Sequence, residues 1–274
     1  MKITEEFISE LKEKAREIRK DILEEVYSAQ SGHPGGALSI AEIVTALYFC
    51  EMNIDPTKPK DENRDRLVLS KGHASAALYA ALAERGFFDK SELKNFRKVG
   101  SFLQGHPDMK KVPGVDMTSG SLGQGLSAAN GMALSSKLDK KGFRVYCIVG
   151  DGEIQEGQIW EAAMTAAHYK LDNLCLIVDN NNLQIDGKVS DVMSVYPLEE
   201  KFESFGFNVI SIDGNNIEEV IGALKDARLT KDKPTAIIAK TVKGKGVSYM
   251  ENQAGWHGKA PKEEEYNKAM EELK

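Results

Sequence analysis

The spacing of apolar residues predicts a long amphipathic helix at the start of the chain. Apolar side chains recur at three- and four-residue steps over residues 4–30, with charged side chains between them. The helix is expected to end at the Gly/Pro-rich residues 32–35, because glycine and proline interrupt helices. A second helix is expected to begin at Ser39, where Glu42 would complete a capping box.

Further along, short apolar runs alternate with segments of helical periodicity. The runs expected to form strands are residues 67–69, 144–149, 174–178, 207–212 and 235–239. Helices are expected at residues 73–85, 158–169, 217–227 and, at the charged tail, 262–274. Continuous apolar strands of this kind are typical of a parallel sheet that is covered on both faces. The sequence therefore predicts one α/β domain over residues 1–274, a doubly wound, mostly parallel sheet with helices on both faces.

Polar residues follow two neighbouring predicted strands at the point where each strand ends. Asp151 and Gly152 follow the strand of residues 144–149, and Asn181 follows the next strand. Open α/β sheets bind ligands outside the carboxyl ends of their strands, where the amides that open a helix can hold a phosphate. A carboxylate, an amide, a backbone carbonyl and diphosphate oxygens suit Mg²⁺ or Ca²⁺. Gly-Asp-Gly alone is usually an ordinary turn, but the matched strand-end positions favour a metal–diphosphate site.

Two glycine-rich segments have weaker meaning. Residues 120–125 could approach a phosphate with their backbone, but their glycine spacing is not that of a dinucleotide-binding fingerprint. Residues 243–246 lack the preceding glycine and the following Ser/Thr of a P-loop. Neither segment identifies a ligand by itself.

Four of the five histidines lie in turns that contain glycine or proline, namely His33, His73, His106 and His257. Histidine exchanges protons near neutral pH, so this grouping favours a polar substrate cleft. A zinc site is the alternative, but the four are dispersed and lack the short spacing of zinc ligands. His168 lies inside a predicted helix and is expected to be structural.

Composition narrows the classes of function. Apolar residues make up 41% of the chain, charged residues 28%, and the net charge is −6. No basic stripe suits nucleic acid and no apolar run suits a membrane span, so neither partner is expected. The charged N-terminus is not a secretory signal. Cys50, Cys147 and Cys175 are expected to be reduced core thiols, as in a cytoplasmic protein.

Several ordered motifs resemble the N-terminal, diphosphate-binding half of a transketolase. They lie at residues 31–35, 69–74, 105–107, 150–157, 178–187 and 240–246. The resemblance extends from the first helix to about Gly258 and implies the thiamine-diphosphate-binding fold of the diphosphate (PP) type. Ser121 is a departure, because many members of the family have proline there. The loop is therefore expected to be looser, although a backbone contact would persist.

The resemblance also implies a cofactor, thiamine diphosphate, and a metal that anchors it. By position, Asp151, Asn181 and the carbonyl of Leu183 would bind Mg²⁺, which Ca²⁺ or Mn²⁺ can replace. The residues implied as cofactor contacts are His73, Gly120, Leu122, Gly152, Glu156, Asn181, Ile185 and His257. Glu156 matches an acidic position near the subunit interface, where it links paired active sites.

The same resemblance implies the catalytic residues. His33, His106 and His257 would bind sugar hydroxyls and assist proton transfers, and His73 would lie at the reacting centre. The implied reaction moves a two-carbon ketol unit from a ketose phosphate to an aldose phosphate, as in the pentose phosphate pathway.

The resemblance leaves part of the enzyme to another chain. The pyrimidine-binding and C-terminal domains are expected on a separate C-terminal transketolase subunit, and the complex is expected to be a dimer of heterodimers. That second chain would supply the glutamate that activates the cofactor, the aromatic residues that stack on it and the basic residues that hold the sugar phosphate.

Other functions remain open at this point. One is a half of a 1-deoxyxylulose-5-phosphate synthase or of a 2-oxoacid decarboxylase, although the Gly-His-Pro-Gly and Ser-Lys-Gly-His motifs favour transketolase. Another is a split transketolase for an unusual sugar, because phosphate-end specificity would lie largely on the partner. A third is a non-catalytic regulatory subunit that binds the cofactor. The presence of Asp151, Asn181 and all four histidines argues against the last.

Overall fold

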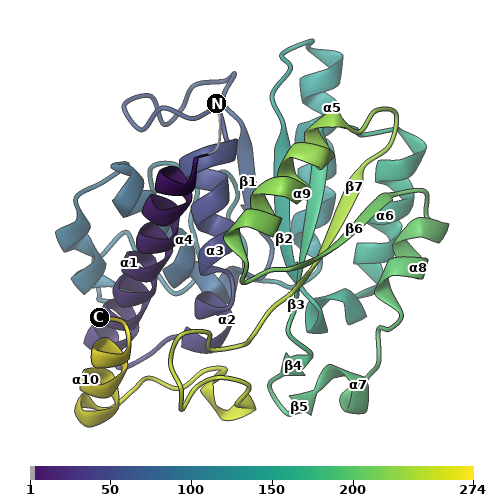
Figure 1. The fold of residues 1–274 in the computed structure, drawn as a ribbon. Helices are drawn as coiled ribbons and strands as arrows, with labels where there is room; N and C mark the ends of the chain where they lie inside the picture. Colours follow the sequence, from purple (N-terminus) through teal and green to yellow (C-terminus); the bar gives the residue numbers. More distant parts are fainter. Residues whose placement is uncertain (1–3) are drawn as a thin grey trace.

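The central feature of the computed structural model, which describes residues 4–274, is a parallel five-stranded sheet (Figure 1). Its strands, in spatial order, are β1 (Arg66–Leu69), β2 (Val145–Gly150), β3 (Leu174–Asn180), β7 (Thr235–Lys240) and β6 (Asn208–Asp213). Each neighbouring pair is parallel. The five predicted strands are therefore confirmed, with small shifts at their ends. Residues 1–3, where the predicted domain begins, lie outside the described residues.

Helices cover both faces of the sheet (Figure 1). One face carries α1 (Glu5–Ala29), α2 (Pro34–Leu38), α3 (Ala41–Ala46), α4 (Ser75–Arg85) and α9 (Ile217–Leu229). The other face carries α5 (Gln124–Leu138), α6 (Gly157–His168) and α8 (Leu198–Ser204). The handedness of the connections explains why α9 lies on the face opposite to α6 and α8. The chain runs outward from β3 to β6 and then back to β7, so a right-handed connection from β6 to β7 must place its helix on the other face. The doubly wound prediction is confirmed.

Alternation along the strands divides the apolar interior into two layers. Ile148 and Ile177 face the layer below α1, α3 and α4, whereas Val149 and Val178 face α5 and α6. Successive strand residues point to opposite faces, so both layers need apolar side chains and the strands become uniformly apolar. This is the reason the strands were visible in the sequence.

The predicted capping box at Ser39 and Glu42 is wrong. Helix α3 begins one residue before Glu42, and its N-cap is Ile40, which makes no side-chain capping bond. The Ser39 hydroxyl instead donates to Asp179 Oδ2 at 2.7 Å. Glu42 accepts hydrogen bonds from the Arg19 guanidinium at 2.6 and 2.7 Å. Both side chains therefore form hydrogen bonds with residues that are distant in the sequence, and they do not cap the helix.

Several elements had no clear signal in the sequence. Helix α5 is rich in glycine, alanine and serine, because it packs closely on the sheet. Its first residues are Gln124 and Gly125, so the C-terminal end of the expected phosphate loop is helical. The other unpredicted elements are α2, which begins inside the Gly/Pro-rich residues expected to be a turn, the hairpin of β4 (Leu183–Gln184) and β5 (Gly187–Lys188), α7 (Val189–Val192) and α8. Short helical turns complete the fold: η1 (Leu47–Glu51), η2 (Gly72–Ala74), η3 (Lys90–Asn95), η4 (Gly152–Gln155) and η5 (Ala254–Trp256).

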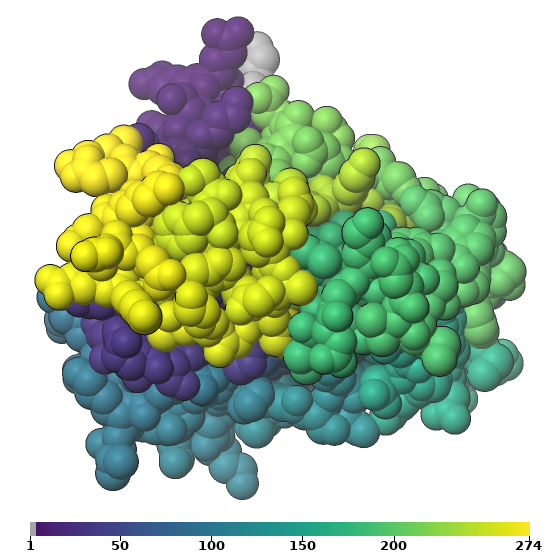
Figure 2. Space-filling view, turned by 90° about the horizontal axis from the view of Figure 1, so that it is seen from below, coloured from purple at the N-terminus to yellow at the C-terminus, as the bar shows by residue number. Residues whose placement is uncertain are grey.

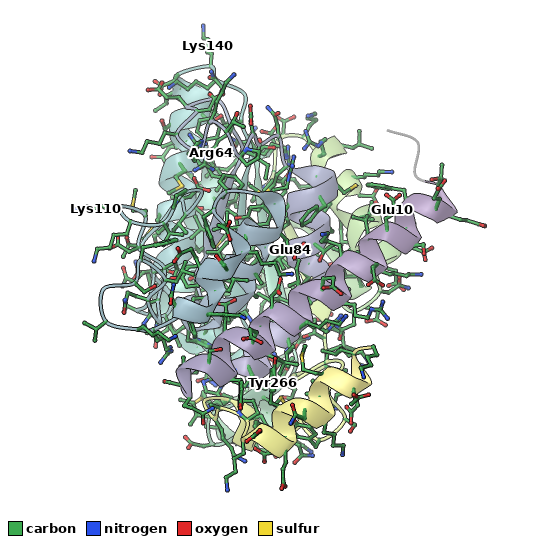
Figure 3. All side chains as sticks on the ribbon, turned by 90° about the vertical axis from the view of Figure 1, so that its left-hand side faces the viewer. Glu10, Arg64, Glu84, Lys110, Lys140 and Tyr266 are labelled. Carbon is green, nitrogen blue, oxygen red and sulfur yellow. The ribbon has the colours of Figure 1, made fainter. Side chains whose placement is uncertain are left out.

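The last helix, α10 (Glu263–Glu272), returns to α1. Figure 3 shows α10 beside the end of α1, with Tyr266 where the two helices meet. The rings of Tyr27 and Tyr266 stack with their centroids 4.1 Å apart, and the Tyr266 hydroxyl donates to Glu24 at 2.5 Å. The last helix of the chain thus packs against the C-terminal half of the first.

Two further predictions concern the environment of the chain. Across residues 4–274, every helix is too short or too polar to span a membrane. All three cysteines are free thiols; Cys147 and Cys175 are buried, whereas Cys50 is only partly buried.

We expect Ile148→Ala to reduce the free energy of unfolding by about 2–5 kcal/mol, because it leaves a cavity between the sheet and its helices. Ile148 is 0% exposed. Urea denaturation measures the loss. The matched control is Val99→Ala, at a residue that is fully exposed, and it should change stability by less than about 0.5 kcal/mol. An equal loss in both variants would contradict the assigned core.

Candidate active site

A cavity of about 390 Å³ lies at the carboxyl edge of the sheet, which Figure 2 views directly. Loops that follow β1, β2, β3 and β7 line it, together with the start of α2. In Figure 2 the yellow segment around residues 240–260 lies beside the green segment around residues 180–195, and a hydrogen bond from Lys243 to Leu183 joins them. Every predicted site residue except His106 lines this cavity.

Asp151, predicted as a metal ligand, is 2% exposed and lies at the start of η4. Its Oδ1 accepts the Gly152 amide at 2.8 Å, and its Oδ2 accepts the amide of Asn182. Burial raises the pKa of Asp151 to about 6, and the neighbouring Asp179 carboxylate adds to the shift. A cation bound beside a buried carboxylate with a raised pKa stabilises its charged form.

The other two predicted metal ligands follow β3, Asn181 in the connection to the hairpin and Leu183 as the first residue of β4. Asn181 accepts the Leu183 amide at 3.0 Å and donates through Nδ2 to Asp179 at 3.1 Å. The Leu183 carbonyl accepts from Lys243 Nζ at 2.9 Å, so this oxygen already faces a positive charge. A carboxylate, an amide oxygen and a carbonyl form the all-oxygen donor set that Mg²⁺ prefers, and these residues therefore fit such an ion.

The alternative of a zinc site concerns the histidines of the cavity. Within residues 4–274 there is no group of three or more His, Cys, Asp or Glu side chains arranged to hold a metal ion. The imidazoles of His33, His73 and His257 do cluster, with ring centroids 5.1–5.3 Å apart. They form a polar wall of the cavity.

Burial controls the protonation of these three histidines. It lowers the pKa of His33 to about 4 and that of His257 to about 3, and it places the pKa of His73 well below its ordinary value. Nearby cations act in the same direction, Arg97 on His33 and Lys243 on His257. All three rings are therefore neutral at pH 7 and can act as hydrogen-bonding groups.

His33 lies at the turn before α2, where Pro34 occupies the first helical position. His106 is exposed at the rim rather than in the cavity; a Cβ on Gly120 would lie 3.5 Å from its ring. His168 ends α6 and is exposed, so it does not join the cluster. Four histidines thus converge on one edge of the sheet, three inside the cavity and one beside it.

The remaining predicted contacts form the rim. Leu122 is 37% exposed and Ile185 is 69% exposed, which leaves two apolar side chains facing solvent at the mouth of the cavity. Glu156 is also exposed, next to the loop that contains Gly123. These positions suit contact with a ligand or with another chain.

Sequence reasoning missed the charged pair beneath the cavity. Lys71 Nζ lies 2.6 Å from Asp179 Oδ2, and both side chains are almost completely buried. Asp179 also accepts hydrogen bonds from Ser39 and Thr241, and Lys71 donates to the Gly36 carbonyl at 2.6 Å. The pair joins α2 to the loops after β1, β3 and β7. Its partners are far apart in the chain, so no local pattern could reveal it.

Glu153 was missed for the same reason. Its buried carboxylate accepts the amides of Gly123 at 2.9 Å and Gly150 at 3.0 Å, and the hydroxyl of Ser70. Burial raises the pKa of Glu153, while these hydrogen bonds oppose that shift. The carboxylate therefore links the segments that contain Ser70, Gly123 and Gly150.

Lys243 is a further residue that sequence reasoning overlooked. Its Nζ donates to the Leu183 carbonyl and lies 2.9 Å from His257 Nδ1. Burial lowers the pKa of Lys243 to about 8, and Lys71 acts in the same direction. The sequence of residues 243–246 was compared only with a P-loop, whose preceding glycine and following Ser/Thr it lacks. A buried ammonium in the cavity wall can meet an anionic ligand.

Removal of Lys71 should destabilise the protein strongly. We expect Lys71→Met to reduce the free energy of unfolding by about 3–5 kcal/mol, because it leaves the Asp179 charge buried without a countercharge. Urea denaturation measures this, with the exposed Lys240→Met as a control of equal chemistry. The double variant Lys71→Met/Asp179→Asn should recover part of the loss. Equal stabilities of the Lys71 and Lys240 variants would contradict the role of the pair.

The chain is similar to one protein family and to several known proteins. Residues 11–273 match the family model "Transketolase, thiamine diphosphate binding domain". The chain is 47% identical over 264 residues to the "6-deoxy-6-sulfo-D-fructose transketolase subunit SqwG" of Clostridium sp. (strain MSTE9), and the match covers 96% of both chains. It is 44% identical to one of the apulose-4-phosphate transketolase subunits of Phocaeicola vulgatus, over 93% of this chain and 90% of the relative.

Longer proteins match over part of their length. Human transketolase is 46% identical over 91% of this chain, which corresponds to 40% of the human protein. The crystal structure of Campylobacter jejuni transketolase superposes with a TM-score of 0.91 at 38% identity, over 100% of this chain and 43% of that one. The chain thus spans less than half the length of these two transketolases.

Proposed function

Since the chain belongs to the transketolase family, and carries its thiamine-diphosphate-binding domain, we propose that it is the N-terminal subunit of a two-chain transketolase. Relatives of similar length support this, because two of them are named as transketolase subunits. The partner is a C-terminal subunit with the pyrimidine-binding domain, and the complex is a dimer of heterodimers. The apolar rim residues Leu122 and Ile185 suit such a contact.

The proposed reaction transfers a two-carbon ketol unit from a ketose phosphate to an aldose phosphate in the cytoplasm, within the pentose phosphate pathway. Thiamine diphosphate supplies the carbanion chemistry of this reaction, and the protein supplies binding and orientation. The observation that carries the proposal is the convergence of Asp151, Asn181 and Leu183 with three histidines around one cavity.

The metal–diphosphate end is assigned to the loops after β2 and β3. Asp151, Asn181 and the Leu183 carbonyl hold Mg²⁺, for which Ca²⁺ or Mn²⁺ can substitute. The Gly152 backbone, which carries no side chain to keep a phosphate away, and the Lys243 ammonium hold the diphosphate, because a buried cation attracts anions. All these groups face the same cavity.

The histidine wall is assigned to the sugar. His33 and His257 hydrogen-bond the hydroxyls of the donor, His73 lies at the reacting centre, and His106 contacts the sugar from the rim. Gly120, Leu122, Ile185 and Glu156 lie at the mouth, where the cofactor and the partner chain meet. The neutral state of the buried rings lets them bind uncharged hydroxyls at pH 7 without desolvating a charge.

A second candidate is a split transketolase for an unusual sugar. Two relatives with more than 40% identity are named for 6-deoxy-6-sulfo-D-fructose and for apulose 4-phosphate. This chain could serve either kind of donor, because the part of the sugar far from the ketol unit would meet the partner. The family match does not favour a 1-deoxyxylulose-5-phosphate synthase half, a 2-oxoacid decarboxylase half or a regulatory subunit.

Ketol transfer from xylulose 5-phosphate to ribose 5-phosphate, with thiamine diphosphate and Mg²⁺, tests the proposal. A tagged chain captured with its partner should be active, and the chain alone should be inactive, because the group that activates the cofactor lies on the partner. If the captured complex acts only on 6-deoxy-6-sulfo-D-fructose or on apulose 4-phosphate, the second candidate replaces the first. Activity of the chain alone would contradict the split enzyme.

Asp151→Ala should weaken binding of thiamine diphosphate and Mg²⁺ to the complex by more than about 100-fold, because it removes the only carboxylate proposed for the metal. Isothermal titration calorimetry measures the affinity. Asp186→Ala is the matched control, since Asp186 is an exposed aspartate in the neighbouring hairpin. Unchanged affinity in Asp151→Ala would show that the metal is held elsewhere.

A further inference from the structure

Arg97 connects two of the histidine motifs. It follows η3 and adopts a φ of 59°, in the left-handed region that residues other than glycine rarely occupy. Its amide donates to the Leu103 carbonyl at 2.7 Å, which holds this backbone in place. From there Nη1 donates to Ser31 Oγ at 2.9 Å and Nη2 lies 3.3 Å from His33 Nδ1. An unusual backbone conformation thus directs a guanidinium at the first histidine of the cavity.

Gly105 makes room for this arrangement. A Cβ at position 105 would lie 2.8–2.9 Å from Cζ, Nε and Nη2 of Arg97, closer than real contacts allow. On the other side, the guanidinium lies 5.4 Å from the ring of Phe96. A methyl group at position 105 would therefore displace the Arg97 guanidinium, and glycine leaves that guanidinium room to reach His33.

The chemistry of the pair determines which nitrogen of His33 carries the proton. A guanidinium has five N–H donors, no acceptor, and stays charged in proteins. His33 Nδ1 must therefore be the acceptor, which requires a neutral ring with its hydrogen on Nε2. Among residues 4–274 no hydrogen-bond partner engages Nε2, and the ring lines the cavity. The N–H group is thus free to meet a ligand.

We propose that Arg97 is a positioning residue, which holds His33 in the neutral tautomer that presents Nε2–H to an oxygen of the donor sugar. The tautomer follows from this chain alone; only the identity of the bound oxygen rests on the proposed function. His33 is then a hydrogen-bond donor to a hydroxyl or carbonyl oxygen. It is not a base at Nε2, because that nitrogen has no free lone pair.

The surroundings of His33 favour the same state. The titratable groups that act on it are Arg97, His106 and Lys243, and the rings of His73 and His257 lie within 5.3 Å. Each of these is either cationic or neutral at pH 7. Together with burial they lower the pKa of His33 to about 4, so a second proton on the ring is disfavoured.

Nitrogen NMR of the full chain labelled with ¹⁵N-histidine measures the tautomer directly. The His33 signals are assigned by their loss in His33→Gln. In the wild type at pH 7 we expect Nδ1 without hydrogen and Nε2 with hydrogen. A charged ring, or a ring with its hydrogen on Nδ1, would overturn the proposal without any Arg97 variant.

Variants then separate positioning from folding. Arg97→Met and Gly105→Ala should produce a mixture of tautomers and a higher His33 pKa, because the donor is removed or displaced. Arg97→Lys keeps a group that only donates and should retain the Nε2–H form. Lys98→Gln, at the exposed neighbour, should match the wild type. An unchanged tautomer in Arg97→Met would overturn the proposal.

Activity of the complex with its partner provides the second readout. Arg97→Met should lower kcat/KM for ketol transfer by about 10- to 100-fold, the effect of losing one charge-assisted hydrogen bond, and Arg97→Lys should restore part of it. Full activity with a lost tautomer would overturn the positioning role. The NMR result needs neither cofactor nor partner, so a failure of the proposed function is distinguishable from a failure of this inference.

Discussion

The hydrogen bonds to the buried carboxylate of Asp179 hold together the segments at the carboxyl edge of the sheet. The carboxylate accepts hydrogen bonds from Lys71, Ser39, Thr241 and Asn181. These donors come from the loop after β1, from the end of α2, from the loop after β7 and from the loop after β3. A buried charge is tolerated only when its partners stay in place, so one side chain holds together four segments that are distant in sequence.

Burial shifts the pKa values of two charged side chains in the cavity wall in the direction that favours their neutral forms. The pKa of Asp151 is raised to about 6 and that of Lys243 is lowered to about 8, because each charged form is short of solvent. A divalent cation beside the first and an anionic diphosphate beside the second would compensate both penalties. The neutral histidines complete a surface that suits uncharged sugar hydroxyls. The electrostatics of the wall therefore agree with one ligand that is anionic at one end and polar at the other.

The relatives agree with the proposed division of the enzyme between two chains. The chain carries the thiamine-diphosphate-binding domain and corresponds to about 40% of human transketolase. It contains the groups that we assign to the metal, the diphosphate and the ketol end of the sugar. The groups that distinguish one sugar from another are expected on the partner. Relatives of the same size that are named for different sugars are consistent with this division.

Elements with a local pattern could be predicted from the amino-acid sequence. Helix α1 and the strands were predictable because one face of the helix, and both faces of the central strands, must be apolar. The site motifs were also visible, since glycine and proline beside histidine or aspartate mark turns at strand ends. Tertiary structure decided the rest. Ser39 and Glu42 lost their local cap to partners that lie more than twenty residues away, and α5 was hidden because its buried face is made of small residues. Asp179, Glu153, Lys243 and the partly buried Arg97 were overlooked because the role of such a charge depends on its partners, and only folding brings those partners together.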